Sequence, residues 1–435
     1  MSATGSIVVG KKPDRKANAK GVWDYLSPVT TWILQNPDGK LDPGAGFASH
    51  MELYSAVYNY SVYGYRVEAG AKGVCVMIVA SLRLAALMLE FFLGNLNLAA
   101  QVLYRHLEGH LASHATELAE RCRELRDTDL LNAHISELNR YEKAARKISN
   151  IFSYMDRRWV PRWREKDKTV YNICEMALRQ WKPRFIDTIQ ANETVFSEAM
   201  LKQIASRGVN EETRELTIVK STINSLLRLS AAAEFYDEKT KKKEECFDVY
   251  QEVFEQPFLS ACRERCASQI SQASAATDST NLLRTAHRLV QETEDPVVID
   301  LLHERTVKEL VKQNNAVLVT PHVRLWWSSV LDPLKSSDQP LKSWLDLLSR
   351  FAIGQDEDFN RLWVLAGRVY NGFQCSDVAL EDFVRSTTME SARMQELMDL
   401  VSQSERLQKA FGGGLDKGHK SSQWSVSLLP TWSES

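Results

Sequence analysis

The chain between residues 50 and 60 has the pattern of a helix with two separate apolar faces. Large residues recur there at two helical spacings: Leu53, Val57 and Tyr60 at i, i+4 and i+7, and Met51, Tyr54 and Tyr58 at i, i+3 and i+7. An ordinary surface helix buries one apolar face. A second face of Tyr and Met indicates a second partner, because protein interfaces are enriched in these residue types. Two interpretations stay open: the helix is buried on both sides in a bundle, or its second face binds another protein.

A second tract, residues 148–162, has a similar pattern. Five large apolar residues form one stripe: Ile148, Ile151, Phe152, Met155 and Trp159. Asn150, Tyr154 and Arg158 lie together on another face of the same predicted helix. The tract therefore predicts a helix that buries one face and keeps a polar and aromatic face available.

The rest of the chain follows helical spacing with few interruptions. Only 19 Gly and 12 Pro occur in 435 residues, so long helices and short loops are expected. We predict a first helix over residues 22–34 and a turn at residues 36–39, where the sequence Asn-Pro-Asp-Gly is typical of turns. Further breaks in the helical pattern fall at residues 164–168, 206–210, 275–279, 294–296, 336–340 and 355–357.

Residues 74–93 are almost continuously apolar and long enough to span a membrane. Arg83 lies near the middle, however, and a central arginine costs about 2.5 to 3.5 kcal/mol on insertion scales. Glu90 adds to this cost. Three interpretations remain: an apolar insert in the fold, a translated intron or other gene-model error, and a transmembrane helix. Periodicity does not distinguish them.

Composition and charge narrow the class of protein. Hydrophobic residues make up 44% of the chain and charged residues 25%, as in soluble globular proteins. The net charge of −2 gives no electrostatic case for nucleic acid or an anionic membrane as a partner. Seven cysteines without a Cys-x-x-Cys pair indicate free thiols rather than a disulfide framework. Residues 1–20 are polar and basic without an apolar signal-peptide core, so we expect a disordered arm.

Other candidate chemistry is weak. His106, His110 and His114 follow i, i+4, i+8 spacing, which can clamp a metal, but a polar, solvated helix face is the simpler interpretation. The lysine run at residues 239–243 reads as a solvated helix end or loop. Trp326 and Trp327 are either interface anchors or packing residues between repeats. No nucleotide-binding, hydrolase or metalloprotease motif occurs, so we expect no catalytic residue, no metal and no cofactor.

Both aromatic tracts resemble the N-terminal region of cullins. Residues 51–60 read M-E-L-Y-S-A-V-Y-N-Y, similar to the cullin pattern M-E-L-Y-x-x-V-Y-N-Y. Residues 153–162 read S-Y-M-D-R-R-W-V-P-R, similar to A-Y-L-N-R-H-W-V-R-R. These patterns resemble the F-box (SCF) type of cullin most, and the two helices are the adaptor-docking face of that family. Stretches at residues 249–259, 301–310 and 361–365 resemble later cullin helices.

The resemblance implies an all-α fold of three stacked cullin repeats, each a bundle of about five helices, in an elongated, curved α-solenoid. The repeats would span residues 21–165, 166–290 and 291–415. The first repeat would contain the atypical apolar insert at residues 70–101. Residues 416–435, rich in Ser and Trp, match nothing in the family and are expected to form an unstructured tail.

The resemblance also implies a function. The chain would be a non-enzymatic scaffold of a cullin-RING ubiquitin ligase in the cytoplasm and nucleus, binding an F-box type adaptor and its substrate receptor. The expected adaptor-binding residues are His50, Met51, Tyr54, Tyr58, Tyr154 and Arg158. The sequence stops before anything similar to the C-terminal cullin domain, so no RING subunit is expected to bind. A helical vesicle-tethering or membrane-associated subunit is the alternative, with residues 74–93 as the membrane contact.

Overall fold

A computed structural model describes the residues 12–14, 17–40, 48–63, 82–190, 194–205, 212–232, 235–237, 242–244, 246–275, 278–335, 343, 346–347, 349–350 and 355–369. Only the backbone is described at residues 63, 82–99, 212–215, 235–237, 242–244, 331 and 334–335. The chain divides into two compact units, residues 1–258 and residues 259–435. Each unit is treated by itself below.

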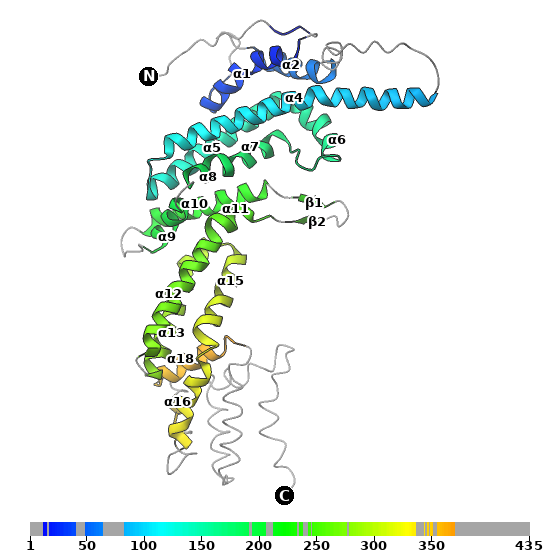
Figure 1. Ribbon diagram of the computed structural model, residues 1–435. Coiled ribbons are helices and arrows are strands. Elements are labelled where there is room, and N and C mark those ends of the chain that lie inside the picture. Colours follow the sequence, from blue (N-terminus) through cyan, green and yellow to red (C-terminus); the bar gives the residue numbers. More distant parts are fainter. Residues whose placement is uncertain are drawn as a thin grey trace. The chain divides into compact units, whose positions relative to one another are not determined.

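Unit 1 is built from helices and one short hairpin (Figure 1). Its elements are α1 (Ala19–Gln35), α2 (His50–Tyr63), α4 (Leu82–Cys122), α5 (Asp127–Ile151), η2 (Met155–Trp159), α6 (Val160–Arg164), α7 (Ile173–Trp181), η3 (Lys182–Ile186), α8 (Asp187–Ile189), α9 (Val195–Ala205), α10 (Glu212–Ala231), β1 (Phe235–Asp237), β2 (Lys242–Glu244), α11 (Asp248–Tyr250), η4 (Gln251–Glu255) and the start of α12 (Gln256–Ala275). The two strands pair antiparallel, with Tyr236 opposite Lys243. The all-α class is confirmed, with this hairpin as an addition.

The first helix and the turn after it are confirmed. Asn18 caps α1 by accepting a hydrogen bond from the Gly21 amide at 2.9 Å. The turn closes with a bond from the Gly39 amide to the Asn36 carbonyl at 3.0 Å. Gly39 lies so close to Trp32 that an added Cβ would stand 2.5 Å from the indole ring. This close approach explains why the turn ends in glycine.

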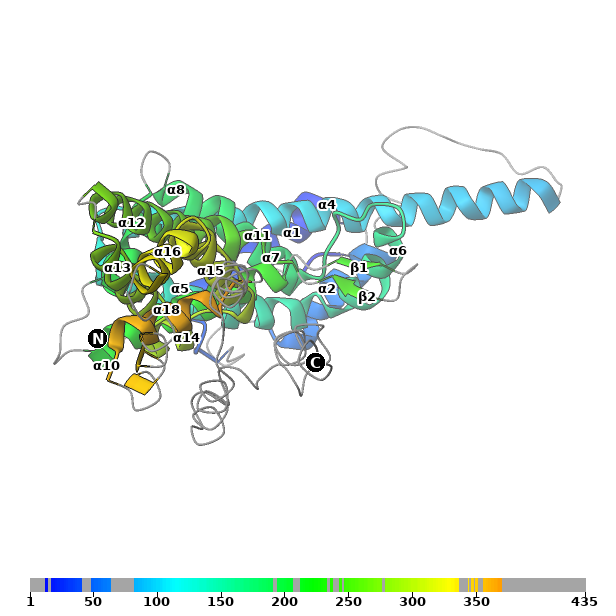
Figure 2. The same ribbon diagram turned by 90° about the horizontal axis from the view of Figure 1, so that it is seen from below.

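Helix α4 is the longest element of unit 1. Figure 1 shows α1 and α2 on one side of it and α7 and α8 on the other. The Leu82 end extends away from the other helices of unit 1 in both views (Figures 1 and 2). The C-terminal part of the expected insert at residues 70–101 is therefore not a separate element. From Leu82 onward its backbone forms the start of α4. Its earlier residues, 70–81, lie outside the described part.

The tract at residues 148–162 is not one regular helix, contrary to the prediction. Helix α5 ends at Ile151, and a π-helical turn, η2, precedes α6. The Val160 amide donates to the Met155 carbonyl, five residues back. Pro161 comes directly after Val160. A proline ring has no N–H to donate and collides with the carbonyl four residues earlier, and a wider turn relieves this clash.

A proline lies close to the other π-helical turns of the described residues as well. Pro257 and Pro321 follow the π-helical turns η4 and η5 (Asn315–Val319) by two residues, as Pro161 follows η2. The remaining described π-helical turn, η3, contains Pro183. Each described π-helical turn thus has a proline in it or close behind it, whereas Pro28 and Pro333 lie inside regular α-helices.

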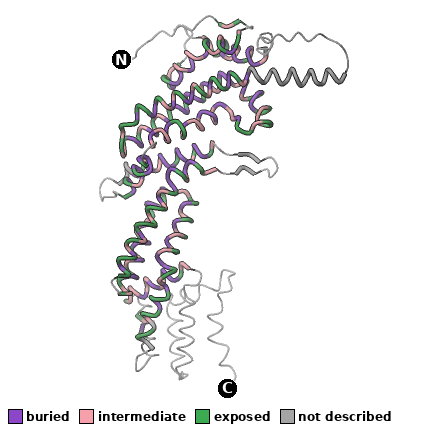
Figure 3. The backbone as a smooth tube through the Cα atoms, viewed as in Figure 1, coloured by how far each residue is buried: buried purple, intermediate pink, exposed green. Residues whose placement is uncertain are grey.

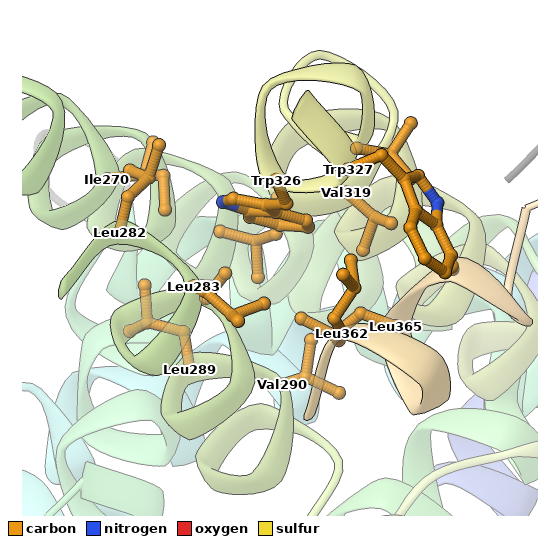
Figure 4. Packing of buried hydrophobic residues seen from close by; sticks show 14 of the residues in the cluster. Ile270, Leu282, Leu283, Leu289, Val290, Val319, Trp326, Trp327, Leu362 and Leu365 are labelled. Carbon is orange, nitrogen blue, oxygen red and sulfur yellow. The ribbon is translucent and has the colours of Figure 1, made fainter. Parts of the chain in front are cut away.

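Unit 2 contains the rest of α12, α13 (Ser279–Thr293), α14 (Pro296–Leu301), α15 (Glu304–Asn314), η5, α16 (Val323–Lys335) and α18 (Glu357–Ala366). Its core joins α12, α13, α16 and α18 around Trp326 and Trp327 (Figure 4). Both indoles pack inside this unit with residues such as Leu283, Leu362 and Leu365. They are core residues and not exposed anchors.

Several predicted breaks are confirmed. Helices end and begin again across residues 164–168, 275–279 and 294–296, and α18 begins at Glu357. The prediction for the lysine run was wrong where it is described, because Lys242 and Lys243 lie in strand β2. The repeat boundaries remain a prediction. The first part of the expected N-terminal arm (residues 1–11) and residues 370–435, which include the expected tail, lie outside the described residues.

Candidate functional site

The candidate docking helix, α2, begins with a reciprocal cap. The Ser49 amide donates to Glu52 Oε2 at 2.7 Å, and the Glu52 amide donates to Ser49 Oγ at 3.3 Å. This arrangement is a capping box, in which two free amides of the first turn find acceptors. The bonds from the Ser49 amide and hydroxyl lower the pKa of the Glu52 carboxyl, so it is charged at the positive end of the helix dipole. The cap residue Ser49 thus fixes the start of α2 at His50.

The two predicted faces of α2 are confirmed by burial (Figure 3). Leu53, Val57 and Tyr60 are buried in unit 1. On the other face the Met51 side chain is 67% exposed and Tyr58 is 36% exposed. Helix α2 is thus not enclosed on both sides within the described residues. That its second face binds another protein stays a prediction.

The second tract presents its residues in the same way. Its apolar stripe is buried throughout: Ile148, Ile151, Phe152, Met155 and Trp159. Tyr154 is half-buried at the start of η2, whereas Asn150 and Arg158 are exposed. The predicted buried stripe of this tract is therefore confirmed, although the backbone contains a π-helical turn.

The Asp156 carboxylate holds η2 in place. It accepts from the Ser149 hydroxyl of α5 at 2.7 Å and from the Ile173 amide, at the start of α7, at 3.0 Å. Burial raises the pKa of Asp156, and these two bonds oppose that rise. Trp159 adds an apolar anchor, with its ring centroid 5.1 Å from that of Tyr104 on α4. Three helices thereby position the turn that carries Tyr154.

The two aromatic tracts meet at one contact. The rings of Tyr58 and Tyr154 lie edge to face, with centroids 4.8 Å apart. Tyr54 stacks on Tyr58 at 6.4 Å, so three tyrosines form a continuous row. Such geometries are favourable for aromatic pairs. Burial and the neighbouring Tyr58 raise the pKa of Tyr154, so its hydroxyl stays a neutral donor and acceptor.

The six predicted site residues are not all in mutual contact. Tyr54, Tyr58 and Tyr154 form the row just described, and we call these three the tyrosine row. His50 and Met51 are exposed in the first turn of α2, and Arg158 is exposed on η2. The sequence reading missed Ser49 and Asp156, which position the site. Ser49 could have been found from the spacing Ser-x-x-Glu before an apolar run, which is typical of a capping box. The role of Asp156 could not, because its contact with Ile173 joins residues that no local sequence pattern relates.

The histidine series is only in part the expected solvated face: His106 is exposed, whereas His110 and His114 are half-buried. His106 stacks on Trp23 of α1 with centroids 5.7 Å apart, and His110 meets the same indole edge-on at 5.5 Å. His114 stacks on Tyr141 of α5. Burial lowers the pKa of His110 and brings that of His114 to about 4. Within the described residues, no group of His, Cys, Asp and Glu is arranged to hold a metal.

Two further expectations concern thiols and membranes. The five described cysteines, at positions 122, 174, 246, 262 and 266, are all free, as predicted. None of the helices in the described part of the chain is both long and apolar enough to cross a bilayer.

The described helices and their buried stripes define a mainly helical protein in each unit. The chain belongs to the cullin family, since the family model described as the cullin alpha solenoid domain matches residues 23–430. The chain is 24% identical over 367 residues to Cullin-1 of Schizosaccharomyces pombe, covering 84% of this chain and 41% of that protein. It is 25% identical over 387 residues to Cullin-1 of Dictyostelium discoideum, covering 89% and 44%. Cell division control protein 53 of Saccharomyces cerevisiae is 22% identical over 321 residues, covering 71% and 35%. The chain thus spans less than half the length of these relatives.

Proposed function

We propose that this chain is the adaptor-binding arm of a non-catalytic scaffold in an F-box type ubiquitin ligase. The observation that carries the proposal is the tyrosine row, in which Tyr58 of α2 meets Tyr154 of the second tract and stays exposed, with Met51 exposed on the same face of α2. Family membership and similarity to two Cullin-1 proteins support it. The proposal includes a cytoplasmic and nuclear location.

The chemistry of the face suits a folded protein partner. Met51 is a flexible apolar side chain that adapts to a pocket, and tyrosines combine apolar area with a hydroxyl. Residues of these kinds carry most of the binding free energy in many interfaces. The row is held by the capping box of Ser49 and by the Asp156 bonds, so little ordering remains to be done on binding.

The solenoid suits the role of a spacer. Its helices pack on buried stripes with few breaks, as in Leu53 and Val57 on α2. A rigid arm would hold a bound substrate receptor at a set distance from the enzyme that transfers ubiquitin, and such positioning accelerates transfer. Under this proposal the described residues bind and position, and do no chemistry.

Isothermal titration calorimetry with a purified F-box type adaptor tests the proposal. Tyr54→Ala should weaken binding by about 2 kcal/mol or more, since it removes the first ring of the row. Tyr54→Phe keeps the ring and should retain most of the affinity. Val364→Ala, at an exposed apolar position of α18 in unit 2, should bind like the parent chain. Equal affinity of the parent and Tyr54→Ala chains would exclude this face, and no binding by the parent chain would exclude the function.

A further inference from the structure

A basic surface borders the tyrosine row. Arg158 on η2 and Arg162 on α6 are both exposed. Their guanidinium groups lie close enough to the Tyr154 hydroxyl to lower its pKa, against the larger effect of burial. The docking face therefore carries the exposed apolar side chain of Met51 on α2 and two guanidinium groups beside Tyr154.

Neither charge is neutralised within the part of the chain that the structure describes. Arg158 and Arg162 have no ion pair there, whereas Arg164, two residues further on, pairs with Glu175 at 3.0 Å. Asp156, the one carboxylate in the η2 sequence, is turned inward to Ser149 and Ile173. The local excess of positive charge contrasts with the net charge of −2 of the whole chain.

We propose that Arg158 and Arg162 form an electrostatic rim of the docking face, and that the partner carries a cluster of carboxylates beside the apolar pocket that receives Met51. This proposal rests on the proposed function and names the chemistry of the partner. Exposed guanidinium groups bind carboxylates through paired hydrogen bonds, and their desolvation costs less than that of lysine ammonium groups. Rim charges of this kind act mainly on the rate of association, because they steer the partner toward the face.

The experiment measures association kinetics of the 435-residue chain with a purified F-box type adaptor at low and high salt. The double variant Arg158→Glu, Arg162→Glu should lower the association rate constant about tenfold or more at roughly 0.05 M salt. The difference should shrink strongly at roughly 0.5 M salt, where exposed charges are screened. Arg158→Gln, Arg162→Gln should give an intermediate effect. A merely structural role for the two arginines would not produce this salt dependence.

The control is Arg184→Glu. Arg184 is also exposed on a π-helical turn of unit 1, η3, and has no ion pair among the described residues. It should leave the association rate unchanged, and thermal unfolding should show that all variants fold. If Tyr54→Ala weakens binding while the double Glu variant associates like the parent, the rim is wrong and the docking face stands.

Two other outcomes are informative. If the parent chain binds no adaptor, the proposed function fails, and the rim fails with it. If the parent chain binds vesicles of anionic phospholipid and the double Glu variant does not, while adaptor association is unaffected, the basic surface faces a membrane and the proposal is overturned.

Discussion

Large aromatic and sulfur-containing side chains are exposed in one region of this molecule and buried in another. On α2, Met51 is 67% exposed and Tyr58 36% exposed. On α16, Trp326 and Trp327 are each 1% exposed. By residue type alone, both tracts are candidate interface anchors. The difference shows that what covers a helix decides the role of its aromatic residues.

The coverage follows from position along each helix. Consecutive residues of a helix point about 100° apart, so Trp326 and Trp327 can both be buried only if α16 is covered over a wide arc. Helices α13 and α18 and the turn η5 contribute residues to that core, including Leu283, Val319 and Leu362 (Figure 4). On α2 only the stripe of Leu53 and Val57 is covered. The predictions below test this contrast from both sides.

The largest expected effect is on the buried side. Trp326→Ala should lower the free energy of unfolding by about 3 to 5 kcal/mol, because it leaves a large cavity in a packed core. Urea denaturation measures this change. Trp326→Phe should cost less, since the indole N–H of Trp326 is buried without an acceptor among the described residues and its loss removes that penalty.

The matched control is the next residue along the chain. Leu325 is 51% exposed on the same helix, so Leu325→Ala should change stability by no more than about 0.5 kcal/mol. A Leu325→Ala variant as unstable as Trp326→Ala would show that exposure does not separate the two kinds of position.

A buried polar group in unit 1 sharpens the comparison. His134 is fully buried, and its Nδ1 accepts from Trp181 Nε1 at 3.3 Å. Its proton is therefore on Nε2, which donates to Ser225 Oγ at 2.8 Å, and that hydroxyl donates to the Thr222 carbonyl at 2.6 Å. Every polar atom of the imidazole is satisfied in the neutral form. Burial accordingly lowers the pKa of His134 to about 3.

The sign of the pH effect follows from that shift. The unfolded chain takes up a proton near the ordinary pKa of 6.5, whereas the folded chain resists it down to about 3. The stability linked to neutral His134 is fully present above pH 6.5 and is lost as the pH falls toward 3. At pH 5 the loss should be roughly 2 kcal/mol for this one group. His114, with a pKa of about 4, acts in the same direction.

Urea denaturation at pH 7 and pH 5 measures this loss. His134→Gln can accept from Trp181 and donate to Ser225 through its amide but does not titrate. Its stability should therefore fall less between the two pH values than that of the parent chain. An equal slope in both chains would mean that His134 is not the titrating group.

The covered half of both aromatic tracts could be read from the sequence, because burial within a helix follows local spacing. Leu53, Val57 and Tyr60 are buried as predicted, and so is the stripe from Ile148 to Trp159. The helix breaks near Pro296 and after Ala275 were equally local signals. The availability of Tyr58 and Met51 could be predicted only as one of two alternatives, because it depends on helices elsewhere in the chain.

What the sequence could not supply was mostly contact between distant residues. The edge-to-face contact of Tyr58 and Tyr154 joins positions 96 residues apart, and apolar spacing does not encode it. The packing of His110 against Trp23 is of the same kind. The π-helical turn before Pro161 was missed for a different reason, since residues in a wider turn keep nearly the same buried stripe.

On the exposed side, Met51→Ala should separate binding from stability. The Met51 side chain is largely exposed in the folded chain, so its truncation removes few packing contacts. The free energy of unfolding should therefore change by no more than about 0.5 kcal/mol. Adaptor affinity should fall by about 1 to 2 kcal/mol if the side chain fills a pocket. Calorimetry and urea denaturation on the same preparation give both values. A loss of stability as large as the loss of affinity would show that Met51 stabilises the fold as a buried residue does.

The smallest expected effect concerns the cap that starts α2. Ser49→Ala removes the hydroxyl acceptor of the Glu52 amide, which keeps its bond to the Ser49 carbonyl at 2.9 Å, and should destabilise the first helical turn by at most about 1 kcal/mol. Met51 lies in that turn, so adaptor affinity should fall by less than tenfold, mainly through faster dissociation. Ser49→Thr keeps the capping oxygen and should behave like the parent chain. Ser55→Ala removes a hydroxyl on the same helix that donates to the Met51 carbonyl at 2.5 Å and caps no amide of the first turn, so it should have no comparable effect on the start of α2. If Ser49→Ala and Ser49→Thr bind with equal affinity, the exposed face does not depend on its cap, and the row of tyrosines alone positions it.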